Sequence, residues 1–275
     1  MERFQEIIIE PGRTEAHYWR DVWRYGDLFL FLAWRDVLVR YKQTLFGFAW
    51  AWLRPLLTMV AFTIVFGRLA NLPSGGVPYP LLVFAGVLAW QFASTAFAAA
   101  AASLVDNANL VAKVYFPRIL MPLAAVAVCL VDVVVAAVLL LPLMLWYGIT
   151  PDLRILALPL FIALTFVIAV GPGLWIAALN VKYRDFRYVI PFLIQFGMYV
   201  SPVGFSTVIV PEQWRLLFAL NPMVGAIEGF RWSLLGGNAP LDVPMLALSG
   251  AVAALLLYVG VVQFRKTEKS FADVI

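Results

Sequence analysis

Long runs of apolar residues are the feature that most limits how this chain can fold. Five stretches exceed twenty residues and hold at most one charged side chain: Tyr79–Val105, Ile119–Thr150, Ile155–Val181, Tyr188–Val210 and Val243–Phe264. An α-helix rises about 1.5 Å per residue, so about 20 apolar residues cross a hydrocarbon core about 30 Å thick. Backbone groups in lipid must be hydrogen-bonded internally, and unbroken apolarity without alternation favours helices over a barrel. The sequence therefore predicts an all-α integral membrane protein.

A sixth apolar stretch precedes these five. Phe48–Phe66 is interrupted only by Arg54, which is close enough to one end for its guanidinium to reach the lipid headgroups. We therefore predict six transmembrane helices per protomer, within a permease domain of residues 46–264. The predicted spans are 46–67, 80–104, 119–147, 154–180, 188–209 and 243–264.

The distribution of basic residues predicts the orientation of the chain. With the N-terminus in the cytoplasm, fifteen Lys and Arg lie on the cytoplasmic side of these spans and four lie on the opposite side. Both termini are therefore expected in the cytoplasm, as tails of residues 1–26 and 265–275. The first 26 residues carry four Glu and lack an apolar core, so no cleavable signal peptide is expected.

Residues 27–45 predict a short helix before the first span. Leu28–Trp34 is apolar but too short to cross a membrane, and charged residues follow it directly. Such a helix lies along the cytoplasmic interface with its aromatic side chains at the acyl boundary. The alternative is an ordinary amphipathic helix packed on the bundle. Both interpretations place it beside the first span.

Residues 211–242 contain two apolar segments that are each too short to span. Leu216–Leu220 and Met223–Ile227 are separated by Asn221-Pro222, which predicts two short helices. They fit a re-entrant hairpin that enters the outer leaflet where protein or water covers its backbone. A gate at the outer mouth is the functional interpretation, and an amphipathic hairpin on the outer surface is the alternative. The candidate gate residues are Asn221, Pro222, Glu228 and Arg231.

The first inner loop, residues 106–117, also predicts a short helix. Asp106 or Asn107 can cap it, and Pro117 marks the start of the next element. Apolar and aromatic residues in this loop are costly to expose to the cytosol, and such anchors suit a helix that binds in a groove of a partner. The alternative is a turn resting on the membrane interface. The residues concerned are Leu110, Val114, Tyr115 and Phe116.

Polar and aromatic residues of the spans are candidates for lining a path. Asp132 lies alone in mid-span at a cost of about 2.5–3.5 kcal/mol, so pairing with a Ser, Gln or Arg of a neighbouring helix is favoured over a pore-lining role. The span 188–209 is the most polar and is the predicted pore-lining helix. Aromatic residues at the start of the first span form an interfacial belt or, alternatively, offer flat faces to sugar rings. These channel candidates are Phe48, Trp50, Trp52, Gln195, Tyr199 and Ser201.

The chain lacks the residues that several classes of protein function need. The chain has no Gly-x-x-x-x-Gly-Lys-Ser/Thr phosphate loop, so it does not bind ATP in that manner. One Cys, Cys129, and one His, His17, argue against a disulfide framework and a metal site. An enzyme acting on lipid-linked sugars would need paired carboxylates, and only Asp132 and Glu228 are available. We therefore expect no catalytic residue, metal or cofactor in this chain, and no nucleic acid as partner.

Several motifs resemble the permease subunits of bacterial type-2 ABC polysaccharide exporters, over nearly the whole chain past residue 20. They are Arg35-Asp36, Arg40-Tyr41-Lys42-Gln43-Thr44, Gly47, Trp50, Arg54-Pro55, Asn107-Ala108-Asn109-Leu110-Val111, Lys113-Val114-Tyr115-Phe116-Pro117-Arg118, Tyr183-Arg184-Asp185, Ser201-Pro202-Val203, Asn221-Pro222-Met223 and the ending Glu268-Lys269-Ser270-Phe271-Ala272-Asp273-Val274-Ile275.

The resemblance implies a homodimer in the bacterial inner membrane, bound to two copies of a separate subunit that holds ATP and Mg. The first and fifth spans of both protomers would line a channel for lipid-linked polysaccharide of the O-antigen, capsule or teichoic acid type. Related permeases for small hydrophobic molecules share the fold. The inner loop would be a coupling helix seated in the ATPase, and the coupling residues would be Asn107, Asn109, Leu110, Lys113, Tyr115, Phe116, Arg118, Tyr183, Arg184 and Asp185.

Overall fold

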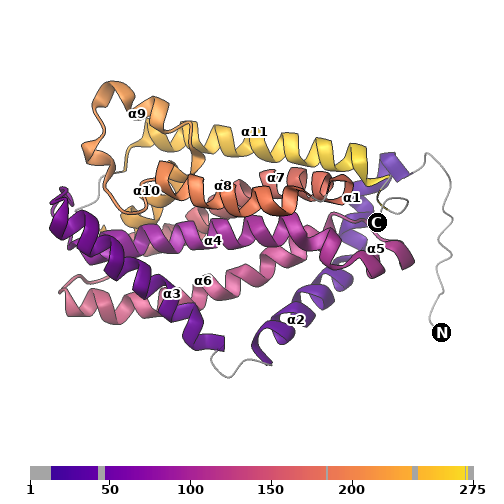
Figure 1. The fold of residues 1–275 in the computed structure, drawn as a ribbon, viewed down its shortest axis with the longest axis horizontal. Coiled ribbons are helices and arrows are strands. Elements are labelled where there is room, and N and C mark those ends of the chain that lie inside the picture. The colour runs from indigo at the N-terminus through magenta and orange to yellow at the C-terminus, as the bar shows by residue number, and fades with distance from the viewer. Residues whose placement is uncertain (1–13, 43–46, 184, 237–240, 270, 272–275) are drawn as a thin grey trace.

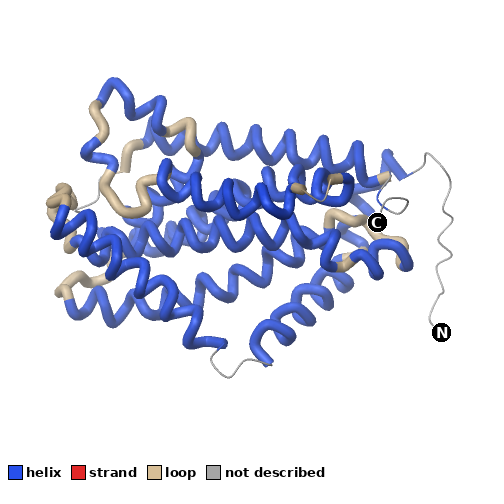
Figure 2. Tube along the Cα trace, in the orientation of Figure 1, coloured by secondary structure: helices blue, strands red, loops and turns tan. Residues whose placement is uncertain are grey.

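A computed structural model describes residues 14–42, 47–183, 185–236, 241–269 and 271 of this chain; for residues 14–17 and 47–51 it describes the backbone alone. Throughout these ranges the chain forms helices joined by turns and loops, without any strand (Figure 2). The predicted all-α fold is therefore confirmed.

Within the described ranges, five helices are long and apolar enough to cross a membrane, and they coincide with five of the six predicted spans. Four of them run along the long axis of the molecule, and α3 crosses them at an angle (Figure 1). Their bounds are α3 (Gly47–Phe62, continued by the π-helix η1, Thr63–Leu69), α4 (Tyr79–Asp106), α6 (Leu120–Trp146), α7 (Leu158–Lys182, preceded by the 3-10 helix η2, Leu153–Ala157) and α11 (Val243–Glu268).

The predicted fifth span, 188–209, ends earlier than expected. The helix found there, α8, covers Phe186–Val200, and after it the chain turns before the short 3-10 helix η3, Thr207–Ile209. Pro202 is the physical reason, because proline lacks a backbone N–H and disfavours helical geometry in the residue before it. Ser201 accordingly has extended backbone angles, φ −98° and ψ 149°. The prediction of one continuous helix to residue 209 was wrong.

The chain nevertheless travels most of the length of α4 in this region. At the start of α8, Phe186 packs on a small cluster that includes Ala101, near the end of α4. Just beyond α8, the carbonyl of Pro202 is bonded to Arg231, which also donates to the carbonyl of Leu82 near the start of α4. Nineteen α4 residues separate these two places, which corresponds to about 28 Å at about 1.5 Å per residue.

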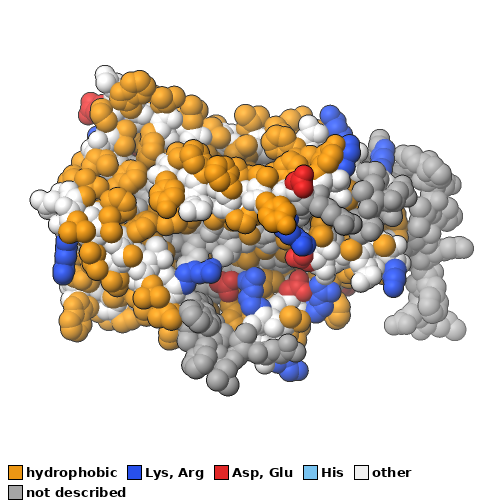
Figure 3. All heavy atoms as spheres, viewed as in Figure 1, with side chains coloured by type: hydrophobic (Ala, Val, Ile, Leu, Met, Phe, Trp, Pro, Cys, Tyr) orange, Lys and Arg blue, Asp and Glu red, His pale blue; other side chains and the backbone are white. Residues whose placement is uncertain are grey.

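Helix α4 is the centre of the bundle. It packs on α6, α7, α10 and α3, and it is the most buried of the five long helices. Its inward face is rich in small residues, and Gly86 lies so close to the backbone of Val203 that a Cβ there would meet its carbonyl oxygen at 2.7 Å. Such close approach is typical of helices packed in a membrane. The face of the molecule drawn in Figure 3 presents a broad hydrophobic surface.

The remaining helices are shorter. They are α1 (Thr14–Arg24), α2 (Gly26–Lys42), α5 (Ala108–Lys113), α9 (Glu212–Phe218) and α10 (Pro222–Leu235). The helices α1 and α5 lie at the end of the molecule where α11 terminates, and α9 lies near the opposite end (Figure 1). Helix α2 packs along α6 with Leu32 buried, which supports the packed-helix alternative for the segment 27–45.

Candidate functional site

The first inner loop contains a short helix, as predicted, but its apolar residues divide into two groups. Val111 and Phe116 are buried in the protein's own core, with Phe116 4% exposed. Tyr115 is 51% exposed, and Asn109 and Lys113 are exposed as well. The buried residues therefore hold the loop on the bundle, and the exposed ones form a surface that we call the α5 surface.

Asn107 precedes α5, but its side chain does not cap that helix. The side-chain amide donates to the carbonyl of Ser103 at 3.0 Å, and Oδ1 accepts from Nη2 of Arg35 at 3.0 Å. Arg35 belongs to α2 and also pairs with its neighbour Asp36 at 2.8 Å. The expected cap is thus replaced by a contact between the start of the loop and α2.

The end of the same loop is bonded to the last turn of α11. The backbone N–H of Arg118 donates to Oε1 of Glu268 at 2.7 Å, and the Arg118 guanidinium donates to the Glu268 carbonyl. Tyr18 of α1 joins this cluster, with the Arg265 guanidinium 4.6 Å from its ring centroid. Burial, together with the nearby Glu268 carboxylate, raises the pKa of Tyr18, so its phenol stays protonated at physiological pH.

The second inner loop lies at the same end of the bundle. Tyr183 and Asp185 are exposed, and the ammonium of Lys182 lies 5.1 Å from the centroid of the Tyr183 ring. Arg184 lies outside the described residues. Asn180, in the last turn of α7, donates to the carbonyl of Ala101 on α4 at 3.1 Å. This contact places the second inner loop beside the end of α4 that precedes α5.

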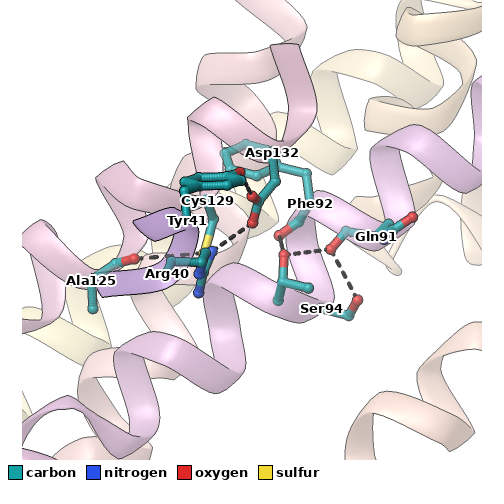
Figure 4. A network of polar contacts seen from close by, with 9 residues as sticks. Arg40, Tyr41, Gln91, Phe92, Ser94, Ala125, Cys129 and Asp132 are labelled. Atoms are coloured by element: carbon teal, nitrogen blue, oxygen red, sulfur yellow. Dashed lines mark hydrogen bonds and ion pairs between the residues drawn. The ribbon is translucent and has the colours of Figure 1, made fainter. Parts of the chain in front are cut away.

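Asp132 is the one charged residue within the five long apolar stretches of the sequence, and it is paired (Figure 4). Its carboxylate accepts from Nη1 of Arg40 at 2.5 Å and from the hydroxyl of Tyr41, and both donors come from the end of α2. The same Arg40 nitrogen lies 3.9 Å from the sulfur of Cys129. The prediction that Asp132 pairs with a neighbouring helix is confirmed, and its partner is α2, the helix predicted within residues 27–45.

The predicted channel residues lie in different surroundings. Tyr199 is 69% exposed, and Gln195 is exposed on the same helix, α8. Trp52 is partly exposed, and its indole N–H donates to the carbonyl of Val135 on α6 at 2.8 Å. Ser201 is 1% exposed and does not face a path within this protomer. The side chains of Phe48 and Trp50 lie outside the described residues.

Further aromatic residues extend the exposed face of α8. Tyr188, Phe192 and Phe196 are all exposed, and the rings of Phe192 and Phe196 stack with centroids 6.2 Å apart. Spacings of four residues place them on one side of the helix. The sequence analysis missed these three residues, and their four-residue spacing was the available signal.

The two short helices predicted between residues 211 and 242 are α9 and α10, separated by Asn221-Pro222. Asn221 caps α10, because its Oδ1 accepts from the N–H of Met223 at 3.0 Å. Its amide nitrogen donates to the hydroxyl of Ser201 at 2.9 Å. A predicted channel residue and a predicted gate residue are therefore direct partners. Gly236, with φ +69°, ends α10.

Arg231 and Glu228, the other two gate candidates, form a buried pair. Arg231 is 2% exposed, and its Nη1 donates to Oε1 of Glu228 at 2.8 Å. The remaining guanidinium nitrogens donate to the carbonyls of Leu82, Pro202 and Val203. At Pro202 and Val203, Arg231 therefore satisfies backbone carbonyls that the break after α8 leaves without helical partners.

Two residues with a role in this geometry received none in the sequence analysis. Arg35 and Glu268 were noted only within longer motifs, yet each bonds one end of the α5 loop. Glu268 is the single acidic residue among the basic residues that follow the last span up to Lys269. A single acidic residue among basic ones could have predicted a specific contact for Glu268.

Known proteins resemble this chain along most of its length. The model of the ABC-2 type transporter family matches residues 27–235. The O-antigen export system permease protein RfbA of Myxococcus xanthus is 28% identical over 258 residues, covering 92% of this chain and 97% of that protein. RfbA of Klebsiella pneumoniae is 24% identical over 257 residues, covering 90% and 95%. The capsule polysaccharide export inner-membrane protein CtrC of Neisseria meningitidis is 26% identical over 236 residues, covering 83% and 87%.

The family match spans more than half of the chain, and it includes the α2 pairing with Asp132, the α5 loop and the buried Arg231. Five long apolar helices agree with a protein that crosses the membrane several times. This chain belongs to the ABC-2 type transporter family, as a multi-pass membrane permease.

Proposed function

We propose that this chain is the permease subunit of an ATP-driven exporter that moves a lipid-linked polysaccharide of the O-antigen type across the bacterial inner membrane. The observation that carries the proposal is the near full-length similarity to O-antigen permeases from two organisms. The shorter similarity to a capsule permease makes capsular polysaccharide the second candidate. Permeases for teichoic acids or small hydrophobic molecules remain the more distant alternatives.

The path of the chain supports six membrane crossings. α7 ends and α11 begins at opposite ends of the bundle (Figure 1), so the segment between them would cross the membrane. Helix α8 has only 15 residues, or about 22 Å, but residues 201–206, all buried except the half-buried Phe205, would extend the path. Their backbone is tolerated at membrane depth because Arg231 and neighbouring protein cover it. Both termini then lie in the cytoplasm.

The channel would form between two copies of this chain. Helix α3 is the least buried of the five long helices, and α8 presents an exposed row of aromatic rings. Aromatic faces suit the C–H side of a sugar ring, and Tyr199 and Gln195 add polar groups. A second protomer facing these helices would enclose a path lined by α3 and α8 from both sides.

The α5 surface and the second inner loop would contact a separate ATP-binding subunit. Two copies of that subunit would bind the dimer. Asn109, Lys113 and Tyr115 are exposed, and Tyr183 and Asp185 lie at the same end of the bundle. This mixture of an aromatic anchor with charged neighbours is typical of a specific contact. Leu110 and Phe116 would support the contact from beneath.

ATP binding would draw the two partner subunits together and displace the α5 loop. Rigid-body shifts of the bundle would then open or close the path. At the outer end, α9 and α10 would form a re-entrant hairpin. Its buried half, α10, would be the fixed base, and α9, with Trp214 and Leu217 exposed, would be the part able to gate the path.

Replacement of Lys113 and Tyr115 by Ala tests the proposed function. We expect loss of surface polysaccharide and accumulation of lipid-linked polymer inside the cell, because the ATPase subunit no longer binds. Co-purification of that subunit and surface-polymer staining measure the two effects. The matched control, Trp214→Ala with Leu217→Ala at the other end of the bundle, should retain ATPase binding. Normal surface polymer in a strain lacking this chain would contradict the proposal.

A further inference from the structure

Each end of the α5 loop is bonded by one side chain from an element distant in sequence. Arg35 of α2 donates to Asn107, 72 residues away, at 3.0 Å. Glu268 of α11 accepts from the N–H of Arg118, 150 residues away, at 2.7 Å. The loop is therefore connected to α2 at its start and to α11 at its end, in addition to its covalent connections with α4 and α6.

The contact at the end of the loop is embedded in packed side chains. Phe264 and Phe271 flank Glu268 in sequence, both are fully buried, and their rings form an edge-to-face pair at 5.4 Å. They belong to the same core cluster as Val111 and Phe116 of the loop. Because interiors are close-packed, the end of α11 cannot separate from the loop without disturbing this core.

The two contacts lead to different parts of the bundle. Helix α2 ends at Arg40 and Tyr41, which are bonded to Asp132 at the middle of α6. Helix α11 runs the length of the molecule and packs on α7 and α10. The base of the predicted outer hairpin is therefore in contact with the helix that Glu268 terminates. A displaced loop would act on α6 through one route and on α10 through the other.

We propose that Arg35 and Glu268 are positioning residues that transmit movement of the α5 loop to α2 and to α11. This inference rests on the proposed role of the loop as the ATPase contact. Neither residue belongs to the α5 surface, so we expect their replacement to leave binding of the ATPase subunit intact. Their loss should let the loop move without carrying the helices with it.

The test uses the complete complex of this chain with its ATPase subunit, reconstituted in membranes with lipid-linked polysaccharide. For Arg35→Ala and Glu268→Ala we expect unchanged ATPase binding and continued ATP hydrolysis. Polymer transported per ATP hydrolysed should fall by about 5-fold or more, the lower range of coupling between two sites. Glu268→Gln keeps an oxygen acceptor for the Arg118 N–H and should restore most of that ratio. Glu212→Ala removes an exposed acid at the other end and is the matched control.

Should Arg35→Ala reduce the amount of folded protein, Asn107→Ala removes the same hydrogen bond from the side of the acceptor. It should reproduce the loss seen in Arg35→Ala, and the double variant should lose no more than either single variant, because both remove one interaction. An unchanged ratio in Arg35→Ala and Glu268→Ala would overturn the inference and leave the proposed function intact. Unchanged ATPase binding after loss of Lys113 and Tyr115 would instead overturn the proposed function.

Discussion

Arg231 shows how a single buried charge can hold an irregular backbone. Four acceptors surround its guanidinium: the Glu228 carboxylate and the carbonyls of Leu82, Pro202 and Val203. A proline-broken helix end in a membrane needs such donors, since lipid supplies none. The arginine geometry, with several N–H groups in one plane, suits this task better than the single ammonium of lysine.

Replacing Arg231 by Leu should lower the stability of the protein strongly. The change leaves Glu228 without its partner and removes the side-chain donor of the Pro202 and Val203 carbonyls, and breaking a buried pair typically costs about 3–5 kcal/mol. Thermal unfolding in detergent measures the effect. Arg215→Leu is the control, because its pair with Glu212 is long, at 3.9 Å, and Glu212 is almost fully exposed. Equal melting temperatures for the two variants would contradict the structural role of Arg231.

Close crossings of helices depend on glycine at particular positions. At the contact between α7 and α11, a Cβ on Gly260 would lie 2.0 Å from the carbonyl oxygen of Gly171. A Cβ on Gly171 would in turn lie 2.7 Å from the backbone of Leu256. Backbone atoms cannot rotate away as a side chain can. This pair of glycines therefore sets the distance between the two helices.

Gly260→Ala should separate α7 from α11 and lower the melting temperature, with a cost of about 1–3 kcal/mol that is typical of overpacking. Gly250→Ala on the same helix is the matched control. No atom lies within 4 Å of a Cβ built there, so it should be neutral or slightly stabilising through its better helix propensity. A melting temperature for Gly260→Ala at or above that of Gly250→Ala would show that the crossing tolerates more space.

The molecule as a whole consists of a packed centre and a looser side. Helices α4, α6, α7 and α10 contribute most of the buried residues, whereas α3 and α8 lie against this centre with much of their surface exposed. Charged side chains gather around α2 and at the end of the molecule that carries α5, and hydrophobic ones cover most of the rest (Figure 3). This division suits a fixed scaffold with one face open to another protomer.

Cysteine labelling should report the membrane topology. In a Cys129→Ser background, Lys113→Cys and Asp185→Cys should react with a membrane-impermeant reagent only from the cytoplasmic side. Glu212→Cys, beyond α8, should react only from the outside, since all three positions are exposed. Labelling of positions 185 and 212 from the same side would mean that α8 does not cross the membrane, and would contradict the six-span proposal.

Apolar length alone was enough to predict five of the helices, because a long unbroken hydrophobic segment has few stable alternatives in a bilayer. The division of α9 from α10 followed from a local signal, Asn221-Pro222. The short α5 was predicted from a capping residue, although the Asn107 side chain bonds to Ser103 and Arg35 instead of capping that helix. The pairing of Asp132 was predictable because an unpaired carboxylate in mid-span costs free energy. These are properties of one segment at a time.

Contacts between distant segments required the folded chain. Apolar length did not predict the break after Val200. Pro202 causes the break, but the donors that make it tolerable, the side chains of Arg231 and Asn221, come from the segment after α9. Phe116 and Tyr115 are adjacent and both aromatic, yet one is buried and the other exposed. The pairing of Arg35 with Asn107 and of Arg118 with Glu268 joins residues that no local pattern relates. Sequence periodicity and hydropathy predict whether one segment forms a helix in water or in lipid. The side-chain contacts depend on which helices pack together, and that is decided only in the folded chain.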